Sequence, residues 1–145
     1  MGRLLDYLMG FATSMIAIYV KKMIDDRALR KRTLLTLRNE LQSNLDVLKK
    51  SARIYLLATV SWDSTRSYLV EKESDLFLKL SNTYSLINTR NNILLLHNNS
   101  MCFGKTLNLE LENGYSYSGD WLDENAKELT KHITGSIDRL NERIN

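Results

Sequence analysis

The chain has 145 residues, of which 43% are hydrophobic and 26% are charged, and it contains no proline. These values exclude an intrinsically disordered chain and are typical of one ordered domain, and the lack of proline favours long helices. The net charge of +3 is unevenly placed, since residues 1–53 carry +6 and residues 54–145 carry −3. This distribution argues against a nucleic-acid-binding surface over the whole protein, so we expect no direct nucleic-acid binding.

The N-terminal stretch has no charged residue from Tyr7 to Val20 and is followed by a cluster of basic residues. As a helix that includes Leu4 to Asp6, it would extend about 25 Å, against about 30 Å for the hydrocarbon core of a bilayer. We interpret residues 1–22 as a transmembrane anchor in the inner (cytoplasmic) membrane. Because the bases follow the apolar run, residues 23–145 are predicted to form a cytosolic helical bundle domain. The buried start of a long soluble helix remains an alternative.

Two sets of residues in this region have predicted roles at the membrane. Small residues on one helix face let membrane helices approach closely, and the predicted oligomer face consists of Gly10, Thr13, Ser14 and Ala17. The bases that follow are predicted to contact anionic lipid headgroups, with a solvated helical face as the alternative; they are Lys21, Lys22, Arg27, Arg30, Lys31 and Arg32. We therefore expect the membrane as a partner and a homo-oligomer as the assembly.

The next part of the chain continues the helical pattern. Leucines from Leu34 to Leu48 recur at spacings of three and four residues, which predicts one long helix, or two nearly collinear ones, ending near Arg53. Thr59 or Ser61 is then expected to cap a second helix. Apolar residues at helical spacing predict a third helix after Ser74 and a fourth after Asp120.

Between the third and fourth helices the periodicity changes from helical to alternating. Leu107, Leu109 and Leu111 alternate with polar residues, and the pair Asn113-Gly114 separates them from alternating tyrosines. This pattern predicts a small β-hairpin at residues 106–118, packed at a subunit or partner interface. The expected fold class is therefore mainly α, with an N-terminal membrane helix that continues into a cytosolic helical bundle and carries this hairpin.

Residues that could support catalysis or bind a metal are few. The GKT sequence at 104–106 lacks the glycine that a phosphate-binding loop needs five residues before its last glycine. The two histidines are His97 and His132, and the Glu128-xxx-His132 spacing is typical of an exposed pair. Cys102 is the only cysteine and is interpreted as structural. We predict that the protein is not an enzyme and has no metal or cofactor.

One aromatic and basic set could bind a small-molecule nucleotide ligand. Aromatic rings stack on bases, and arginine pairs with phosphate; the candidate residues are Arg66, Arg90, Tyr115, Tyr117 and Trp121. Packing in the core or at an interface is the alternative for the aromatic rings.

Three segments carry a resemblance: LRNELQSNLDVL at 37–48, TVSWDS at 59–64 and LFLKLSNTYSLINTRNN at 76–92. In them the chain resembles a set of small uncharacterised prokaryotic membrane-anchored helical proteins. The resemblance implies a membrane-tethered bundle and no catalytic residues. The leading hypothesis is a non-enzymatic membrane-anchored protein that acts through self-assembly or partner binding. The alternatives are a ligand-gated membrane effector of the antiphage-defence type, whose cytosolic domain senses a nucleotide second messenger, and a soluble helical adaptor.

Overall fold

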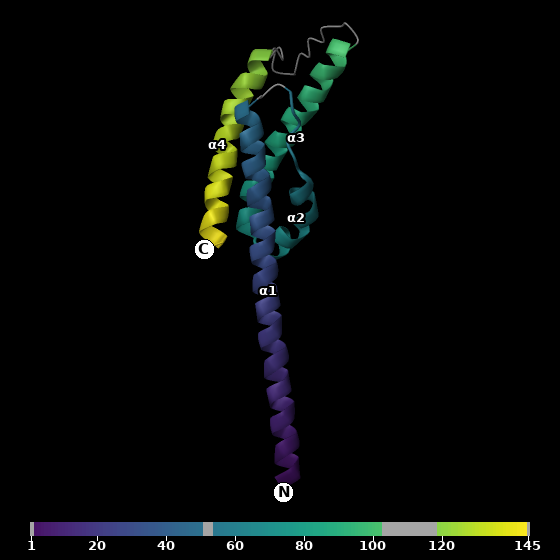
Figure 1. Ribbon diagram of the computed structural model, residues 1–145, viewed down its shortest axis with the longest axis vertical. Helices are drawn as coiled ribbons and strands as arrows, with labels where there is room; N and C mark the ends of the chain where they lie inside the picture. The colour runs from purple at the N-terminus through teal and green to yellow at the C-terminus, as the bar shows by residue number, and fades with distance from the viewer. Residues whose placement is uncertain (1, 51–53, 103–118, 145) are drawn as a thin grey trace. The chain divides into compact units, whose positions relative to one another are not determined.

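Four helices form most of the described part of the chain, which covers residues 2–50, 54–102 and 119–144 of a computed structural model. In chain order they are α1 (Gly2–Lys50), α2 (Val60–Lys72), α3 (Ser74–Cys102) and α4 (Gly119–Ile144) (Figure 1). The prediction of a mainly α fold is confirmed. Of the two alternatives predicted for the N-terminal part, one long helix or two nearly collinear ones, the structure has the single helix. The described ranges contain no strand. The hairpin predicted at 106–118 lies outside them.

The predicted membrane helix is wrong. Among the described helices, none combines the length and the apolar character needed to cross a membrane. The reason lies in the composition of α1: its uncharged stretch contains Gly10, Thr13 and Ser14 and ends at Val20, directly before Lys21. A segment of spanning length therefore takes in polar or charged residues at its ends. The predicted transmembrane anchor at residues 1–22 and the inner-membrane localisation are corrected by this finding.

The chain divides into two compact units, Met1–Leu34 and Leu35–Asn145. In the second unit, the C-terminal part of α1 contributes one row of buried leucines to the core: Leu37, Leu41, Leu45 and Leu48. Their spacing of three and four residues keeps them on one face of the helix. The periodicity of the sequence therefore predicts this part of the core correctly.

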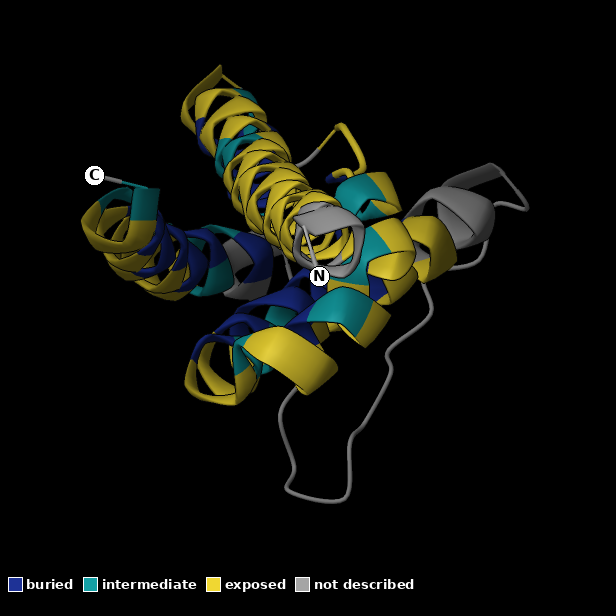
Figure 2. Cartoon of the chain, turned by 90° about the horizontal axis from the view of Figure 1, so that it is seen from below, coloured by how far each residue is buried: buried dark blue, intermediate teal, exposed yellow. Residues whose placement is uncertain are grey.

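The same second unit buries one face each of α3 and α4. From α3 the buried side chains include Leu76, Leu80, Tyr84, Ile87 and Leu94, and from α4 they include Leu122, Leu129, Ile133, Ile137 and Leu140. Figure 2 shows buried residues on the sides of these helices that face their neighbours and exposed residues on the outer sides. Burying each large apolar side chain contributes about 1.5–3 kcal/mol, so these two stripes are a main source of stability in the second unit.

Candidate functional site

A short non-helical segment before α2 is held by two asparagine side chains from different helices. Asn44 of α1 accepts a hydrogen bond from the Ala58 backbone N–H (2.7 Å) and donates one to the Ala58 carbonyl (2.8 Å). Asn91 of α3 does the same for Leu57, at 2.9 and 2.8 Å. Each amide replaces the hydrogen bonds that a neighbouring strand would provide, because it carries both an acceptor and a donor. The entry into α2 is thereby fixed from both sides.

The N-terminus of α2 is capped by a carboxylate from α1. The Ser61 backbone N–H donates to Oε2 of Glu40 at 2.6 Å, and the Trp62 N–H points to Oε1 at 3.4 Å. The first N–H groups of a helix lack partners within the helix, and a negative charge there is favourable. The predicted capping by a Thr59 side chain is not observed, since Thr59 occupies the N-cap position without a side-chain cap hydrogen bond.

Glu40 also organises the aromatic part of the core. The Tyr84 hydroxyl donates to Oε1 of Glu40 at 2.7 Å. Burial, followed by this hydrogen bond and the Glu40 charge, raises the pKa of Tyr84 far above its usual range. The Tyr84 ring stacks on Trp62 at a centroid distance of 4.8 Å, and Phe77 stacks on Trp62 at 5.5 Å. The indole is therefore packed between two rings of α3.

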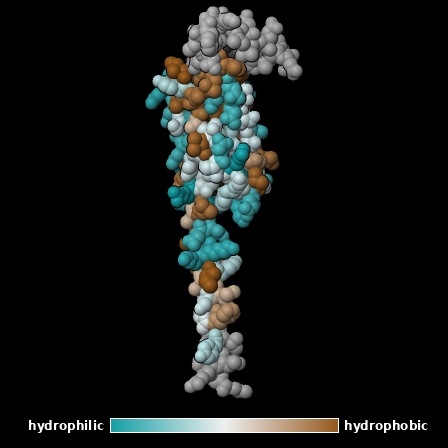
Figure 3. Space-filling view, turned by 90° about the vertical axis from the view of Figure 1, so that its right-hand side faces the viewer, coloured by the Kyte–Doolittle hydropathy of each residue, from teal (hydrophilic) through white to brown (hydrophobic). Residues whose placement is uncertain are grey.

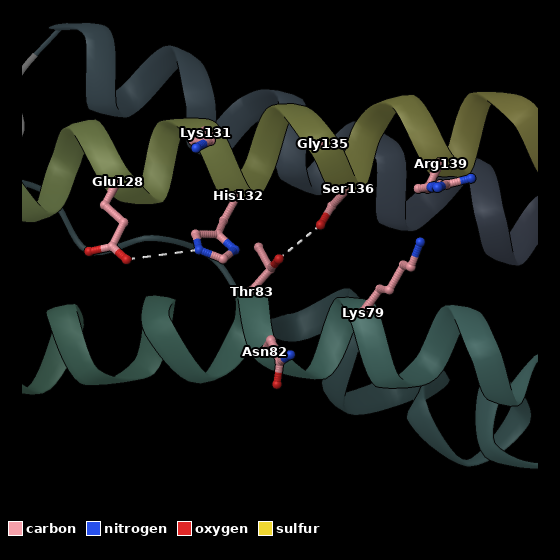
Figure 4. A pocket seen from close by; sticks show the side chains of 9 residues that line it. All are labelled: Lys79, Asn82, Thr83, Glu128, Lys131, His132, Gly135, Ser136 and Arg139. Atoms are coloured by element: carbon pink, nitrogen blue, oxygen red, sulfur yellow. Dashed lines mark hydrogen bonds and ion pairs between the residues drawn. The ribbon is translucent and has the colours of Figure 1, made fainter.

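A groove with a cavity volume of about 420 Å³ lies between α3 and α4. We call it the α3–α4 groove; it is lined by Lys79 and Thr83 from α3 and by His132, Gly135, Ser136 and Arg139 from α4, among others. Figure 4 shows Thr83 and Ser136 pointing toward each other at its centre, where their hydroxyl oxygens lie 2.8 Å apart. Both side chains are buried, so they form a polar floor. Such a volume falls within the range of small-molecule sites.

The charges around the α3–α4 groove are mainly positive. Lys79, Lys131 and Arg139 line it together with a single carboxylate, that of Glu128. Glu128 lies at one end, with its Oε1 4.0 Å from Nε2 of His132, and both side chains are exposed, as the sequence spacing predicts. The other end is basic. Lys131, one turn after Glu128 on α4, lies at the same end as Glu128 and His132, whereas Lys79 and Arg139 lie toward the other end (Figure 4).

Gly135 lies on the wall of the groove within an exposed stretch of α4. A Cβ built at this position meets no atom within 4 Å. Because glycine within a helix costs conformational entropy, we expect Gly135→Ala to raise the free energy of unfolding by about 0.5–1 kcal/mol. Urea denaturation followed by circular dichroism measures the change. A decrease in the free energy of unfolding would show that the protein needs glycine at position 135, although a Cβ there meets no neighbouring atom.

The second candidate surface is the N-terminal part of α1. Its large apolar side chains are 41% to 79% exposed; they are Tyr7, Met9, Phe11, Met15, Ile16, Ile18, Tyr19, Val20, Met23 and Ile24. We call them the apolar segment of α1. Figure 3 shows hydrophobic patches along this helix, followed by a hydrophilic band. Contiguous exposed apolar surface of this kind marks interaction sites in proteins.

The four residues of the predicted oligomer face lie within this apolar segment and are exposed: Gly10, Thr13, Ser14 and Ala17. The Thr13 hydroxyl donates to the carbonyls of Met9 (2.7 Å) and Gly10 (3.0 Å), and the Ser14 hydroxyl donates to that of Gly10 (2.9 Å). Covering this face would therefore bury no unsatisfied hydroxyl. Of the six predicted headgroup contacts, five are exposed and Arg30 is partly buried.

The predicted nucleotide-binding residues occupy different environments. Arg66 is exposed on α2, whereas the Arg90 side chain is buried on α3 and donates from Nη1 to the Tyr55 carbonyl at 3.1 Å. Burial lowers the pKa of Arg90. Tyr115 and Tyr117 lie outside the described residues, and the side chain of Trp121 does as well. Arg90 thus helps to hold the segment before α2, together with Asn91.

Sequence reasoning missed both the buried polar cluster and the basic groove. Glu40 and Asn44 are buried and Asn91 is partly buried, and their places beside apolar stripes are the only signal of this in the sequence. Lys79 and Arg139 belong to separate helices, so no spacing in the sequence brings them together. Within the described ranges, no group of three or more histidine, cysteine or acidic side chains could hold a metal ion.

Comparison with known proteins gives no match to a family model, to a curated protein or to a solved structure. The resemblance to small membrane-anchored helical proteins stays a prediction. The α3–α4 groove and the apolar segment of α1 are the two candidate interaction sites among the described residues.

Proposed function

We propose that this chain is a non-enzymatic helical protein that acts by self-assembly, with two copies pairing through the apolar segment of α1. The observation that carries the proposal is the exposure of ten large apolar side chains between Tyr7 and Ile24. Leaving such side chains in water is unfavourable by about 1.5–3 kcal/mol each relative to burying them. A second copy of the same segment supplies an apolar surface of equal length.

The small residues support close pairing of two helices. Gly10 has open space around its backbone, and Thr13, Ser14 and Ala17 lie on the same side of the helix. If two copies run antiparallel about a centre between residues 13 and 14, Gly10 of one copy lies opposite Ala17 of the other. Thr13 then lies opposite Ser14. This register matches small residues with small residues along the contact.

Charge favours the antiparallel arrangement over the parallel one. Residues 21–32 carry a net charge of +4. Parallel pairing would place two such segments side by side, where like charges repel. Antiparallel pairing places them at opposite ends of the contact, about 20 Å or more apart, which exceeds the screening length of about 8 Å at physiological salt. We therefore propose an antiparallel pair.

The expected result is that Ala17→Leu weakens the assembly of the full chain about ten- to hundredfold, because overpacking a close contact costs about 1–3 kcal/mol. Analytical ultracentrifugation over a range of concentrations measures the dissociation constant. Ala28→Leu is the matched control, since Ala28 is an exposed alanine on the same helix outside the apolar segment. A monomeric wild-type chain, or equal effects of the two variants, would contradict the proposal.

Orientation is tested by cross-linking in a Cys102→Ser background. Mixing a Gly10→Cys chain with an Ala17→Cys chain should give a mixed disulfide dimer, because antiparallel pairing places these positions opposite each other. Each variant alone should cross-link poorly. Efficient dimers of Gly10→Cys with itself would indicate parallel pairing and overturn the proposed orientation.

A further inference from the structure

The basic end of the α3–α4 groove brings two cations from different helices to the same place. Figure 4 shows the Lys79 side chain extending from α3 toward α4 and the Arg139 side chain lying across from it. Among the described residues, no carboxylate forms an ion pair with Lys79. Arg139 pairs with Glu142 of its own helix at 2.9 Å, where both side chains are about half exposed or more. An exposed pair of this kind contributes little, so an anion can compete for the guanidinium.

The polar floor adds a hydrogen-bond donor beside these cations. Thr83 and Ser136 share one hydrogen bond, in which either hydroxyl is the donor. Whichever hydroxyl accepts keeps its own hydrogen for a further acceptor. An ammonium, a guanidinium and a hydroxyl are the donors that proteins combine around phosphate oxygens.

The charges along the α3–α4 groove favour one orientation of a bound molecule. Glu128 precedes Arg139 by about three turns of α4, or about 16 Å. Lys131 offsets the Glu128 charge at that end, whereas Lys79 and Arg139 line the other end, so a phosphate is held more favourably between Lys79 and Arg139. The remainder of a ligand would then extend along the groove toward Glu128 and His132, which can accept and donate hydrogen bonds. A cavity of about 420 Å³ has room for such a remainder.

We infer that the α3–α4 groove binds a phosphate group, either as free phosphate or as the ester of a small molecule, between Lys79 and Arg139. The site differs from the predicted nucleotide set, since neither Arg66 nor Arg90 lines the groove. The inference does not depend on self-assembly, because every lining residue lies within Leu35–Asn145.

Calorimetric titration of the full chain tests the inference with inorganic phosphate, adenosine monophosphate and adenosine. Lys79→Gln and Arg139→Gln should each raise the Kd for both phosphate-containing probes about tenfold or more, since each removes a charge-assisted hydrogen bond. Lys127→Gln is the matched control, because Lys127 is an exposed lysine of α4 that does not line the groove. Gly135→Leu should block binding by filling the wall, whereas Gly135→Ala should leave it intact.

The three probes identify the source of the phosphate. Equal Kd values for inorganic phosphate and adenosine monophosphate would assign the site to free phosphate. A value at least tenfold lower for the nucleotide would assign it to a phosphate ester. Adenosine binding as tightly as its monophosphate, no binding of either phosphate probe, or equal loss of binding in Lys127→Gln would overturn the inference. Since Lys79→Gln should leave the sedimentation behaviour unchanged, failure of this site is distinguishable from failure of assembly.

Discussion

Glu40→Ala should lower the free energy of unfolding by about 3 kcal/mol. The substitution removes the acceptor of the Ser61 N–H and of the Tyr84 hydroxyl, and leaving a buried donor unsatisfied costs about 1–3 kcal/mol. It also removes the negative charge at the start of α2, where such a charge is stabilising. Denaturation by urea, followed by far-UV circular dichroism, measures the loss.

Three comparisons make the result specific to the Glu40 contacts. Asp46→Ala removes the same charge from an exposed position of α1 and should change stability by less than about 0.5 kcal/mol. Glu40→Gln keeps an acceptor oxygen, so its free energy of unfolding should lie between those of the wild-type protein and Glu40→Ala. Tyr84→Phe should lower the free energy of unfolding less in the Glu40→Ala protein than in the wild-type protein, because Tyr84 and Glu40 share one hydrogen bond. Strict additivity of these two substitutions would contradict the network.

The helices and their buried faces follow from local patterns in the sequence. The leucine spacing of α1 and the apolar stripe of α4 are periodic over several turns, and such periodicity depends on residues that are close in the chain. Leu37, Leu41 and Leu140 are buried as this periodicity predicts. The predicted membrane helix is wrong for a related reason: a run without charges is typical of an anchor, but this run is short, and its small polar residues lower its hydropathy.

The polar contacts depend instead on residues far apart in the chain. The Glu40 carboxylate caps a helix whose first residues are about twenty positions away, and Asn91 holds a backbone segment more than thirty positions away. No short motif encodes such a pairing, because any acidic or amide side chain at the right point in space would serve. The same applies to the α3–α4 groove, whose cations meet only after the two helices pack.

Trp62→Ala should strongly destabilise the second unit, lowering the free energy of unfolding by about 3–5 kcal/mol. The Trp62 side chain is buried and stacks on Phe77 and Tyr84, at interplanar angles of 13° and 11°. Its removal leaves a cavity between α2 and α3 and loses both ring contacts, each of which contributes about 0.5–1.5 kcal/mol beyond area burial. Chemical denaturation measures the total effect.

Trp62→Phe separates the contribution of ring stacking from that of side-chain volume, because it keeps an aromatic ring and reduces the volume of the side chain. It should lower the free energy of unfolding clearly less than Trp62→Ala does. Combined with Glu40→Ala it should be non-additive, since the Trp62 ring lies against the same Tyr84 that Glu40 holds in place. Near-UV circular dichroism gives a second measurement. Compared with the wild-type protein, Tyr84→Phe should lose less of the aromatic signal than Trp62→Phe does. A Trp62→Ala protein as stable as wild type would show that α2 does not depend on this aromatic packing for its place against α3.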